Sequence, residues 1–437
     1  MAEPRVAITG LGVVTPAGVG APATWESLMA GKSAVKGVDL FDASAFPSRI
    51  GGQLDGFSAN AYVPKTYRKS VKVMARDIQI AVAAADLAFR DSGIVTRGID
   101  PDRTTIDSRR LGCNIGAGLI CSDLDELGAA VATALEDGKF SFRLWGATGM
   151  NNLTPLWLLK YLPNMLSCHV TIIHGAEGPS NCITCGDASG QMAIGEAARY
   201  ISRGAADAAI AGGAESKLNP MGLLRQALLK RLCTGRNDEP AAACRPFDKG
   251  HDGTVIAEGG GLVIVEDMDR AKSRGAKLYA EVVGFGGACD PGGIDVLTAN
   301  AGGLDLAVAK AVADAGIEPS DVGLIVAHGT GVAQEDRREA AAWKKALGPS
   351  AAKIPAMALT GATGTMFAGH GGVAVAMAAM AIREQVVPPT ANFSSPDDGC
   401  ELNFSDKPRP SDIKYVVCGS FTVGGQSGAV VLKDCRL

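Results

Sequence analysis

The sequence has no basic tract, and its net charge of −4 over 437 residues is close to balanced. A nucleic-acid-binding role therefore has no electrostatic support. The chain also lacks an apolar run that could span a bilayer, because the longest, around residues 373–382, is short and rich in alanine. The opening MAEPRVAITG has no basic region followed by an apolar stretch, so no secretory signal is expected.

Paired metal ligands and a complete dinucleotide fingerprint are missing too. The eleven cysteines are scattered, which is typical of reduced thiols in the cytoplasm, where we expect the protein. Cys182 and Cys185 form a C-x-x-C pair without a second pair or a histidine at ligand spacing, which disfavours zinc or redox chemistry. Gly10-Leu-Gly12 is followed by Thr15 where the third fingerprint glycine belongs, so a tight turn is the simpler interpretation. No metal and no resident cofactor is predicted.

What the sequence does contain is an alternation of short apolar runs with amphipathic stretches, which is typical of layered α/β architecture. Strands are predicted at residues 6–10, 208–211, 262–266, 278–283, 324–327, 415–418 and 429–432. Helices are predicted at residues 24–30, 77–91, 189–202, 304–314, 335–346 and 373–383. Several strands are continuous apolar runs, as expected when both faces of a sheet are covered.

The chain also shows a coarse twofold echo. Each half contains a strand that enters a glycine-rich turn, AAIAGG from residue 208 and LIVAHG from residue 324. A charged seam at residues 267–275 lies between two predicted strands. We therefore expect an N-terminal half of residues 1–267 and a C-terminal half of residues 268–437.

Several segments, in order along the chain, resemble landmarks of the β-ketoacyl-acyl-carrier-protein synthases, the elongating condensing enzymes of fatty-acid and type II polyketide assembly. They are RVAITGLGVVTPAG, HVTIIHGAEGPS, DAAIAGGAES, CRPFDKGHDG, VAHGTG, VPPTANFSSPDDGC and GSFTVGGQSG. The resemblance covers essentially the whole chain. It implies a thiolase-like fold, with two mirrored α/β halves forming a five-layered αβαβα core, and a dimer whose substrates arrive on the phosphopantetheine of an acyl carrier protein.

The nucleophile position of this family departs from the pattern. Family members hold the acyl chain on a cysteine in T-A-C-[ST]-[ST]-G, at a helix N-terminus that lowers the pKa of the thiol. Counted from Gly178-Pro-Ser180 to Gly190, the nucleophile position is Asp187. A carboxylate there can form only a mixed anhydride, which water hydrolyses quickly. The structural interpretation is a helix N-cap, worth about 1 kcal/mol. Cys185, two residues upstream, is not expected to replace the nucleophile.

Of the two catalytic histidines of the family, one matches a histidine of this sequence and the other is replaced. His328, in the H-G-T match, corresponds to the first. In the family's K-[ST]-x-x-G-H the lysine becomes Thr360 and the second histidine becomes Thr365, while the glutamate of the following helix becomes Ala374. His370 follows on a glycine-rich turn, and we expect it to point elsewhere than a side chain at position 365.

Three further features of the family map onto this sequence. The closing loop reads Phe421-Thr-Val423, where valine replaces the gate aromatic, so the acyl tunnel is expected to be wider or filled from elsewhere. Asp336 and Glu339 match an acidic pair that we interpret as structural. A basic cluster resembles the docking surface for the acidic carrier protein, although an ordinary solvated face would look the same. Its residues are Lys65, Arg68, Lys69, Lys72 and Arg76.

The joint loss of nucleophile, second histidine, motif lysine and its glutamate favours a non-condensing subunit, unable to condense on its own. This resembles the chain-length factor of type II polyketide and aryl-polyene synthases, which pairs with an active ketosynthase and shapes the acyl tunnel. Chain-length factors often carry Gln at the nucleophile position, so Asp187 departs from that pattern as well. Two alternatives stay open: a homodimeric acyltransferase or thioester hydrolase that uses Asp187 or Cys185, and a self-paired, acyl-binding regulatory protein.

Overall fold

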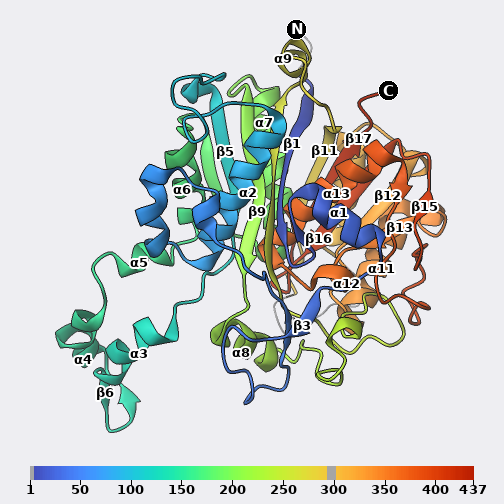
Figure 1. The fold of residues 1–437 in the computed structure, drawn as a ribbon. Coiled ribbons are helices and arrows are strands. Elements are labelled where there is room, and N and C mark those ends of the chain that lie inside the picture. Colours follow the sequence, from blue (N-terminus) through green and yellow to red (C-terminus); the bar gives the residue numbers. More distant parts are fainter. Residues whose placement is uncertain (1–3, 293–301) are drawn as a thin grey trace.

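A long mixed sheet of eleven strands runs through the molecule (Figure 1). Ten strands form two halves of five, and the short β2 (Gly18–Val19) pairs with β1 beside them. The computed structural model describes residues 4–292 and 302–437. The N-terminal half has the order β1 (Val6–Thr15), β10 (Glu258–Asp267), β9 (Ala208–Ser216), β5 (Leu111–Gly116) and β8 (Ser180–Ile183). The C-terminal half has the order β11 (Ala280–Cys289), β17 (Gln426–Lys433), β16 (Tyr415–Phe421), β12 (Val322–Ala327) and β13 (Ala356–Ala358).

The two halves of the sheet repeat one pattern of strand directions. In each half, the first two neighbouring pairs are antiparallel and the next two are parallel. The halves join where residues 6–8 of β1 pair with residues 280–282 of β11. The predicted duplication of an α/β unit is therefore confirmed.

Helices form three layers around the two half-sheets (Figure 1). Between the half-sheets lie α7 (Ser189–Ser202) and α13 (His370–Glu384), which contact strands of both. The outer face of the N-terminal half-sheet carries α2 (Arg76–Ser92) and α6 (Met165–His174). The outer face of the C-terminal half-sheet carries α10 (Leu304–Asp314), with α11 (Ala333–Leu347) beside it. The order is αβαβα, as the resemblance implied.

Small residues allow the central helices to lie this close to the strands and to each other. Every residue of α13 from His370 to Ile382 is buried. A Cβ added to Gly372 would lie 1.8 Å from the carbonyl oxygen of Gly261 on β10, and one added to Gly190 of α7 would lie 2.7 Å from the backbone nitrogen of Gly372. Only glycine fits at this crossing, which places the N-termini of α7 and α13 next to each other.

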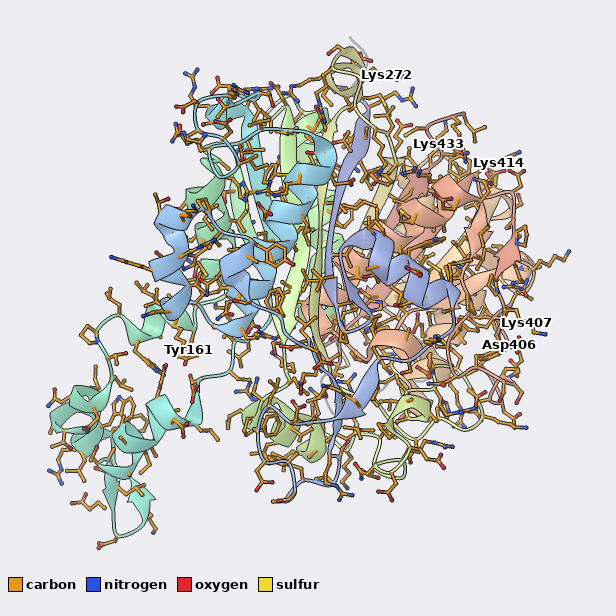
Figure 2. All side chains as sticks on the ribbon, in the orientation of Figure 1. Tyr161, Lys272, Asp406, Lys407, Lys414 and Lys433 are labelled. Atoms are coloured by element: carbon orange, nitrogen blue, oxygen red, sulfur yellow. The ribbon has the colours of Figure 1, made fainter. Side chains whose placement is uncertain are left out.

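A segment between β5 and α6, which we call the arm (residues 119–164), projects from the body (Figure 1). Its base is tied by Tyr161 (Figure 2), whose hydroxyl donates to Glu126 at 2.7 Å, and by the ion pair of Lys160 with Glu126 at 2.5 Å. The arm contains α3 (Leu124–Ala132), β6 (Leu135–Glu136), β7 (Lys139–Phe140), α4 (Phe142–Ala147) and α5 (Trp157–Lys160). Among the described residues, no helix combines the length and the apolar character that crossing a membrane requires.

Candidate functional site

Asp187 lies in a single 3-10 turn (Gly186–Ala188) that leads into α7. Its side chain is buried, and Oδ1 lies 3.4 Å from Nε2 of His328. The interpretation of Asp187 as a helix N-cap is wrong, because α7 begins two residues later and its N-terminus has no side-chain cap bond. The hydroxyl of Ser189 instead accepts the backbone N–H of Cys185 at 2.8 Å. The carboxylate of Asp187 is therefore aimed at a histidine and not at the helix.

The loop that carries His328 is held by buried carboxylates of α11. Glu339 accepts the backbone N–H groups of His328 at 2.7 Å and Gly329 at 2.8 Å, and Asp336 accepts that of Gly331 at 3.1 Å. Both carboxylates are buried and satisfied by backbone donors, which is the condition for a charge inside a protein. The structural role predicted for Asp336 and Glu339 is confirmed.

His370 lies inside the site, contrary to the expectation from the sequence. Its ring centroid is 4.6 Å from that of His328, and both side chains are fully buried. The physical reason is the local turn: Phe367 has a left-handed φ of 48°, and His370 is the first residue of α13. Because Cβ bonds tilt toward the N-terminus of a helix, its imidazole points back toward His328.

The two threonines at the altered motif positions are engaged in local hydrogen bonds. The hydroxyl of Thr360 donates to the carbonyl oxygen of Gly329, directly after His328. The hydroxyl of Thr365 shares a hydrogen bond of 2.7 Å with that of Thr254. Thr360 thus steadies the histidine loop, whereas Thr365 is tied to the strand-like segment beside it.

The pKa values of Asp187, His328 and His370 are shifted in different directions. Burial alone raises the pKa of Asp187, but His328 and Arg231 more than offset this, and the pKa lies below its ordinary value. Burial alone lowers the pKa of His328, whereas Asp187 raises it above its ordinary value. The pKa of His370 is well below its ordinary value because of burial and the neighbouring His328. The site therefore holds an Asp187–His328 ion pair beside a neutral His370.

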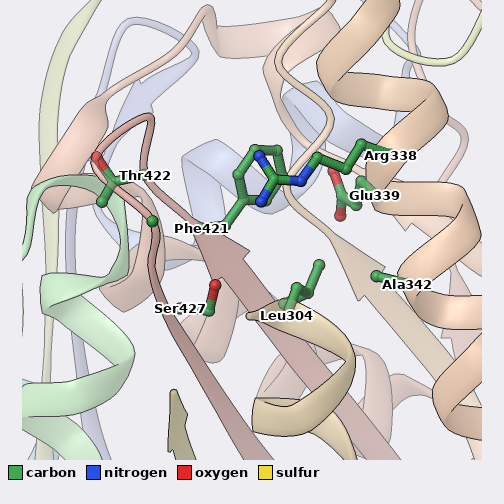
Figure 3. Close-up of a pocket in the computed structure, with 8 residues that line it drawn as sticks. Leu304, Arg338, Glu339, Ala342, Phe421, Thr422 and Ser427 are labelled. Atoms are coloured by element: carbon green, nitrogen blue, oxygen red, sulfur yellow. The ribbon is translucent and has the colours of Figure 1, made fainter. Parts of the chain in front are cut away.

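A pocket of about 500 Å³ ends at Asp187. Asp187 and Val423 line it, whereas neither His328 nor His370 does. Phe421 lines a second, narrow pocket (Figure 3), in which Leu304 and Arg338 leave about 10 Å³, roughly the space for one water molecule. The rings of Phe421 and His328 meet edge to face, with centroids 5.3 Å apart. Asp187 thus contacts both this pocket and His328, and the two gate positions, Phe421 and Val423, face different cavities.

Residues that the sequence interpretation missed form buried ion pairs around this pocket. Arg231 donates through Nε and Nη2 to both carboxylate oxygens of Glu335, at 2.7 and 2.8 Å, and through Nη1 to Gln226 at 2.7 Å. Lys217 is paired with Glu215. Glu215 lies in the landmark segment DAAIAGGAES, but no motif marks Lys217, Arg231 or Glu335. The available signal for these three was their charge within segments that the fold buries.

Cys185 has the environment of a structural thiol. Burial raises its pKa, the opposite of what a nucleophilic cysteine needs. It does not line the pocket that ends at Asp187. Among the described residues, no group of three or more histidine, cysteine or acidic side chains is arranged to hold a metal ion.

The predicted basic cluster lies mostly on one short element, the 3-10 helix η2 (Lys65–Val73). Lys65, Arg68, Lys69 and Lys72 are exposed there, and none has an ion-pair partner among residues 4–292 and 302–437. Arg76 does not belong to this set, because it donates to both oxygens of Glu258 at 2.7 and 2.9 Å. We call the four exposed residues the η2 basic face.

The duplicated αβαβα core and a pocket that ends at the N-terminus of a central helix define a thiolase-like fold. Sequence models described as "Beta-ketoacyl synthase, N-terminal domain" and "Beta-ketoacyl synthase, C-terminal domain" match residues 3–271 and 279–394. The chain belongs to the β-ketoacyl synthase family.

Individual relatives match along almost their full lengths. A 3-oxoacyl-[acyl-carrier-protein] synthase 2 from Coxiella burnetii is 35% identical over 99% of both chains. A ketosynthase solved with its type II polyketide synthase acyl-carrier protein and bound to the hexaketide is 29% identical, with a TM-score of 0.84 and 99% of both chains covered. The ishigamide ketosynthase/chain length factor shares the fold, at 24% identity, a TM-score of 0.83 and 99% coverage of both chains.

Proposed function

We propose that this chain is a non-condensing ketosynthase-like subunit of the chain-length-factor type, which binds an acyl chain and pairs with an active ketosynthase in fatty-acid or type II polyketide synthesis. The observation that carries the proposal is the Asp187–His328 ion pair at 3.4 Å, at the end of the larger pocket. A carboxylate cannot hold a thioester. The Asp187 carboxylate instead pairs with His328, the histidine that matches the family pattern. An acyl thioester in the pocket would meet Asp187 before either histidine.

Partner binding is supported by two exposed features. Among the described residues, the edge strand β8 pairs only with β5, and its residues Ser180 and Asn181 are exposed. An open edge of this kind is a template for a strand of another chain. On the arm, Phe142 and Leu156 are 84% and 77% exposed, within a set of exposed apolar side chains that a monomer rarely displays. The set is Leu119, Leu124, Leu135, Phe140, Phe142, Met150, Leu156, Leu158 and Leu159.

Carrier-protein binding is supported by the η2 basic face. Its four cations are exposed and unpaired among the described residues, as a surface for an acidic partner requires. The variants Lys65→Glu and Arg68→Glu should weaken carrier binding, and the wild-type affinity should fall as salt is added. Lys407→Glu, on a distant exposed loop (Figure 2), is the charge-matched control.

The alternative of altered chemistry has weaker support in the geometry. The lowered pKa of Asp187 makes it a poor base, and the raised pKa of Cys185 keeps that thiol protonated. Incubation with an acyl-loaded and a malonyl-loaded carrier protein tests both proposals in one experiment. We expect neither a condensation product nor an adduct on the chain by mass spectrometry, while an intact ketosynthase forms both. A covalent acyl group on Asp187 or Cys185 would show that the site is reactive.

The pairing itself is tested by co-expression. We expect the chain to purify with the ketosynthase encoded nearest to it, as a complex of one copy each. Purification as a homodimer that ignores every ketosynthase offered would favour the self-paired regulatory alternative.

A further inference from the structure

The pocket that ends at Asp187 is lined by three cationic side chains: Lys217, Arg225 and Arg231. Two of them are neutralised inside the protein. Lys217 is paired with Glu215, and Arg231 makes its two-point contact with Glu335. Each of these cations is accounted for as part of a buried ion pair.

Arg225, on α8 (Pro220–Leu228), is the exception. It is half-buried, and within the described part of the chain its guanidinium makes one polar contact, from Nη1 to Sγ of Cys121 at 3.3 Å. A thiol is a weak acceptor. No carboxylate among the described residues lies within ion-pair distance of Arg225. The planar fork of an arginine, partly withdrawn from water, is matched best by two oxygens of a carboxylate or a phosphate.

The charge balance of the pocket sets the charge of a ligand that would pair with Arg225. Asp187 is already paired with His328, just as Glu215 and Glu335 are paired with Lys217 and Arg231. Among the described residues that line the pocket, Arg225 is therefore the cation without a carboxylate partner. A singly charged oxyanion neutralises it, whereas an uncharged acyl end leaves the guanidinium without a partner.

We infer that Arg225 is the anchor for a singly charged oxyanion carried by the ligand of this pocket. Two sources share this chemistry: a carboxylate at the far end of an acyl chain, and the phosphodiester of a carrier-bound pantetheine arm. The rest of the lining suits the uncharged part of such a ligand, because Leu119, Leu229 and Phe367 present apolar surface. The inference rests on one part of the proposed function, namely that this pocket binds an acyl-pantetheine.

Three matched probes test it by titration calorimetry with the full chain. They are the amide analogues of hexanoyl-pantetheine, of adipoyl-pantetheine, which replaces the terminal methyl by a carboxylate, and of hexanoyl-pantetheine with a methyl phosphodiester on the pantetheine hydroxyl. Each is titrated into wild type, Arg225→Gln and Arg225→Lys. Arg49→Gln, an exposed arginine without an ion pair among the described residues, is the control. Thermal unfolding checks that all variants are folded.

We expect one anionic probe to bind wild type about tenfold or more tightly than the neutral probe, which is the range for a charge-assisted pair. Arg225→Gln should abolish that advantage, Arg225→Lys should keep part of it, and Arg49→Gln should keep all of it. An advantage for the adipoyl probe identifies a carboxylated acyl chain, and one for the phosphodiester probe identifies the carrier arm. If the hexanoyl probe binds and Arg225→Gln changes nothing, the anchor is disproved while acyl binding stands. If no probe binds wild type, both the anchor and the acyl-binding role are disproved.

Discussion

At the residue scale, the central feature of this protein is the substitution at position 187, which changes the ion pairs of the site while the site stays packed with side chains. Asp187 stands where the family has cysteine, and it forms an ion pair with His328, while His370 packs against the same imidazole. Asp187 lines the pocket of about 500 Å³, and neither histidine does. The site is thus a packed and charged element of the core, with one face toward the pocket.

The first prediction concerns the charge of this pair. Since the pKa of His328 is raised, its contribution to stability is full below about pH 6.5 and is lost as the pH rises through the folded-state pKa. The pKa of Asp187 is lowered, so its contribution is present above about pH 3.8 and is lost only in stronger acid. Asp187→Asn should therefore lower the free energy of unfolding by about 1–3 kcal/mol near pH 5.5, and by less as the pH is raised.

Urea denaturation across this pH range measures the effect. Asp412→Asn, at an exposed carboxylate, should change stability by less than about 0.5 kcal/mol at every pH. A loss in Asp187→Asn that is the same at all pH values would mean that His328 is not charged in the folded protein.

A second prediction at this scale concerns Arg231 and Glu335. Removing one partner of a buried pair leaves the other charge unpaired, so Arg231→Met should destabilise the protein by about 3–5 kcal/mol. The double variant Arg231→Met/Glu335→Met replaces both charges by apolar groups and should recover most of that loss. Denaturant titration of Arg231→Met, Glu335→Met and the double variant completes this double-mutant cycle. If the two single losses in stability add up to the loss in the double variant, the two side chains do not interact.

At the element scale, the sequence predicted the elements whose pattern is strongest. The predicted bounds of α7 and α10 coincide with the structure, because continuous amphipathic runs end there at polar or glycine residues. β5 was missed because it carries a buried polar residue, Asn114, whose amide donates to the carbonyl oxygen of Ala193. β8 and β13 were missed because they are only four and three residues long.

The candidate site was predicted less completely than the fold. Position counting identified Asp187 and His328, because both follow motifs of fixed length. It placed His370 wrongly, because the direction of that ring depends on the left-handed turn at Phe367 and on where α13 begins. A lone histidine within a buried run of glycine and alanine was the available signal. The ion-pair partner of Arg231, Glu335, is 104 residues distant in the sequence, and only the fold brings the two together.

The close crossing of α7, α13 and β10 supplies the third prediction. A methyl group on Gly372 would overlap the backbone of Gly261, which cannot move without displacing the sheet. Gly372→Ala should therefore lower stability by about 3 kcal/mol or more. Gly128→Ala, in the exposed helix α3 with no atom within 4 Å of the added carbon, should raise stability by up to about 1 kcal/mol. Thermal unfolding of the two variants compares the glycine-to-alanine change at the helix crossing with the same change on an exposed helix. Equal changes in stability would show that the crossing is packed less closely than described.

At the scale of the whole molecule, the body is a packed five-layer core, whereas the arm exposes the side chains that a core would bury.

The final prediction is that the arm joins the molecule to its partner. Phe142→Asp/Leu156→Asp should abolish association, because each change places a charge in a surface that is to be desolvated. The melting temperature should not change, since the two side chains are largely exposed and contribute little to folding. Leu306→Asp, at a residue 49% exposed on α10 of the other half, should leave association intact. Sedimentation measures the outcome: a double variant that associates as wild type does would place the interface elsewhere, whereas loss of association in Leu306→Asp alone would move it to the C-terminal half.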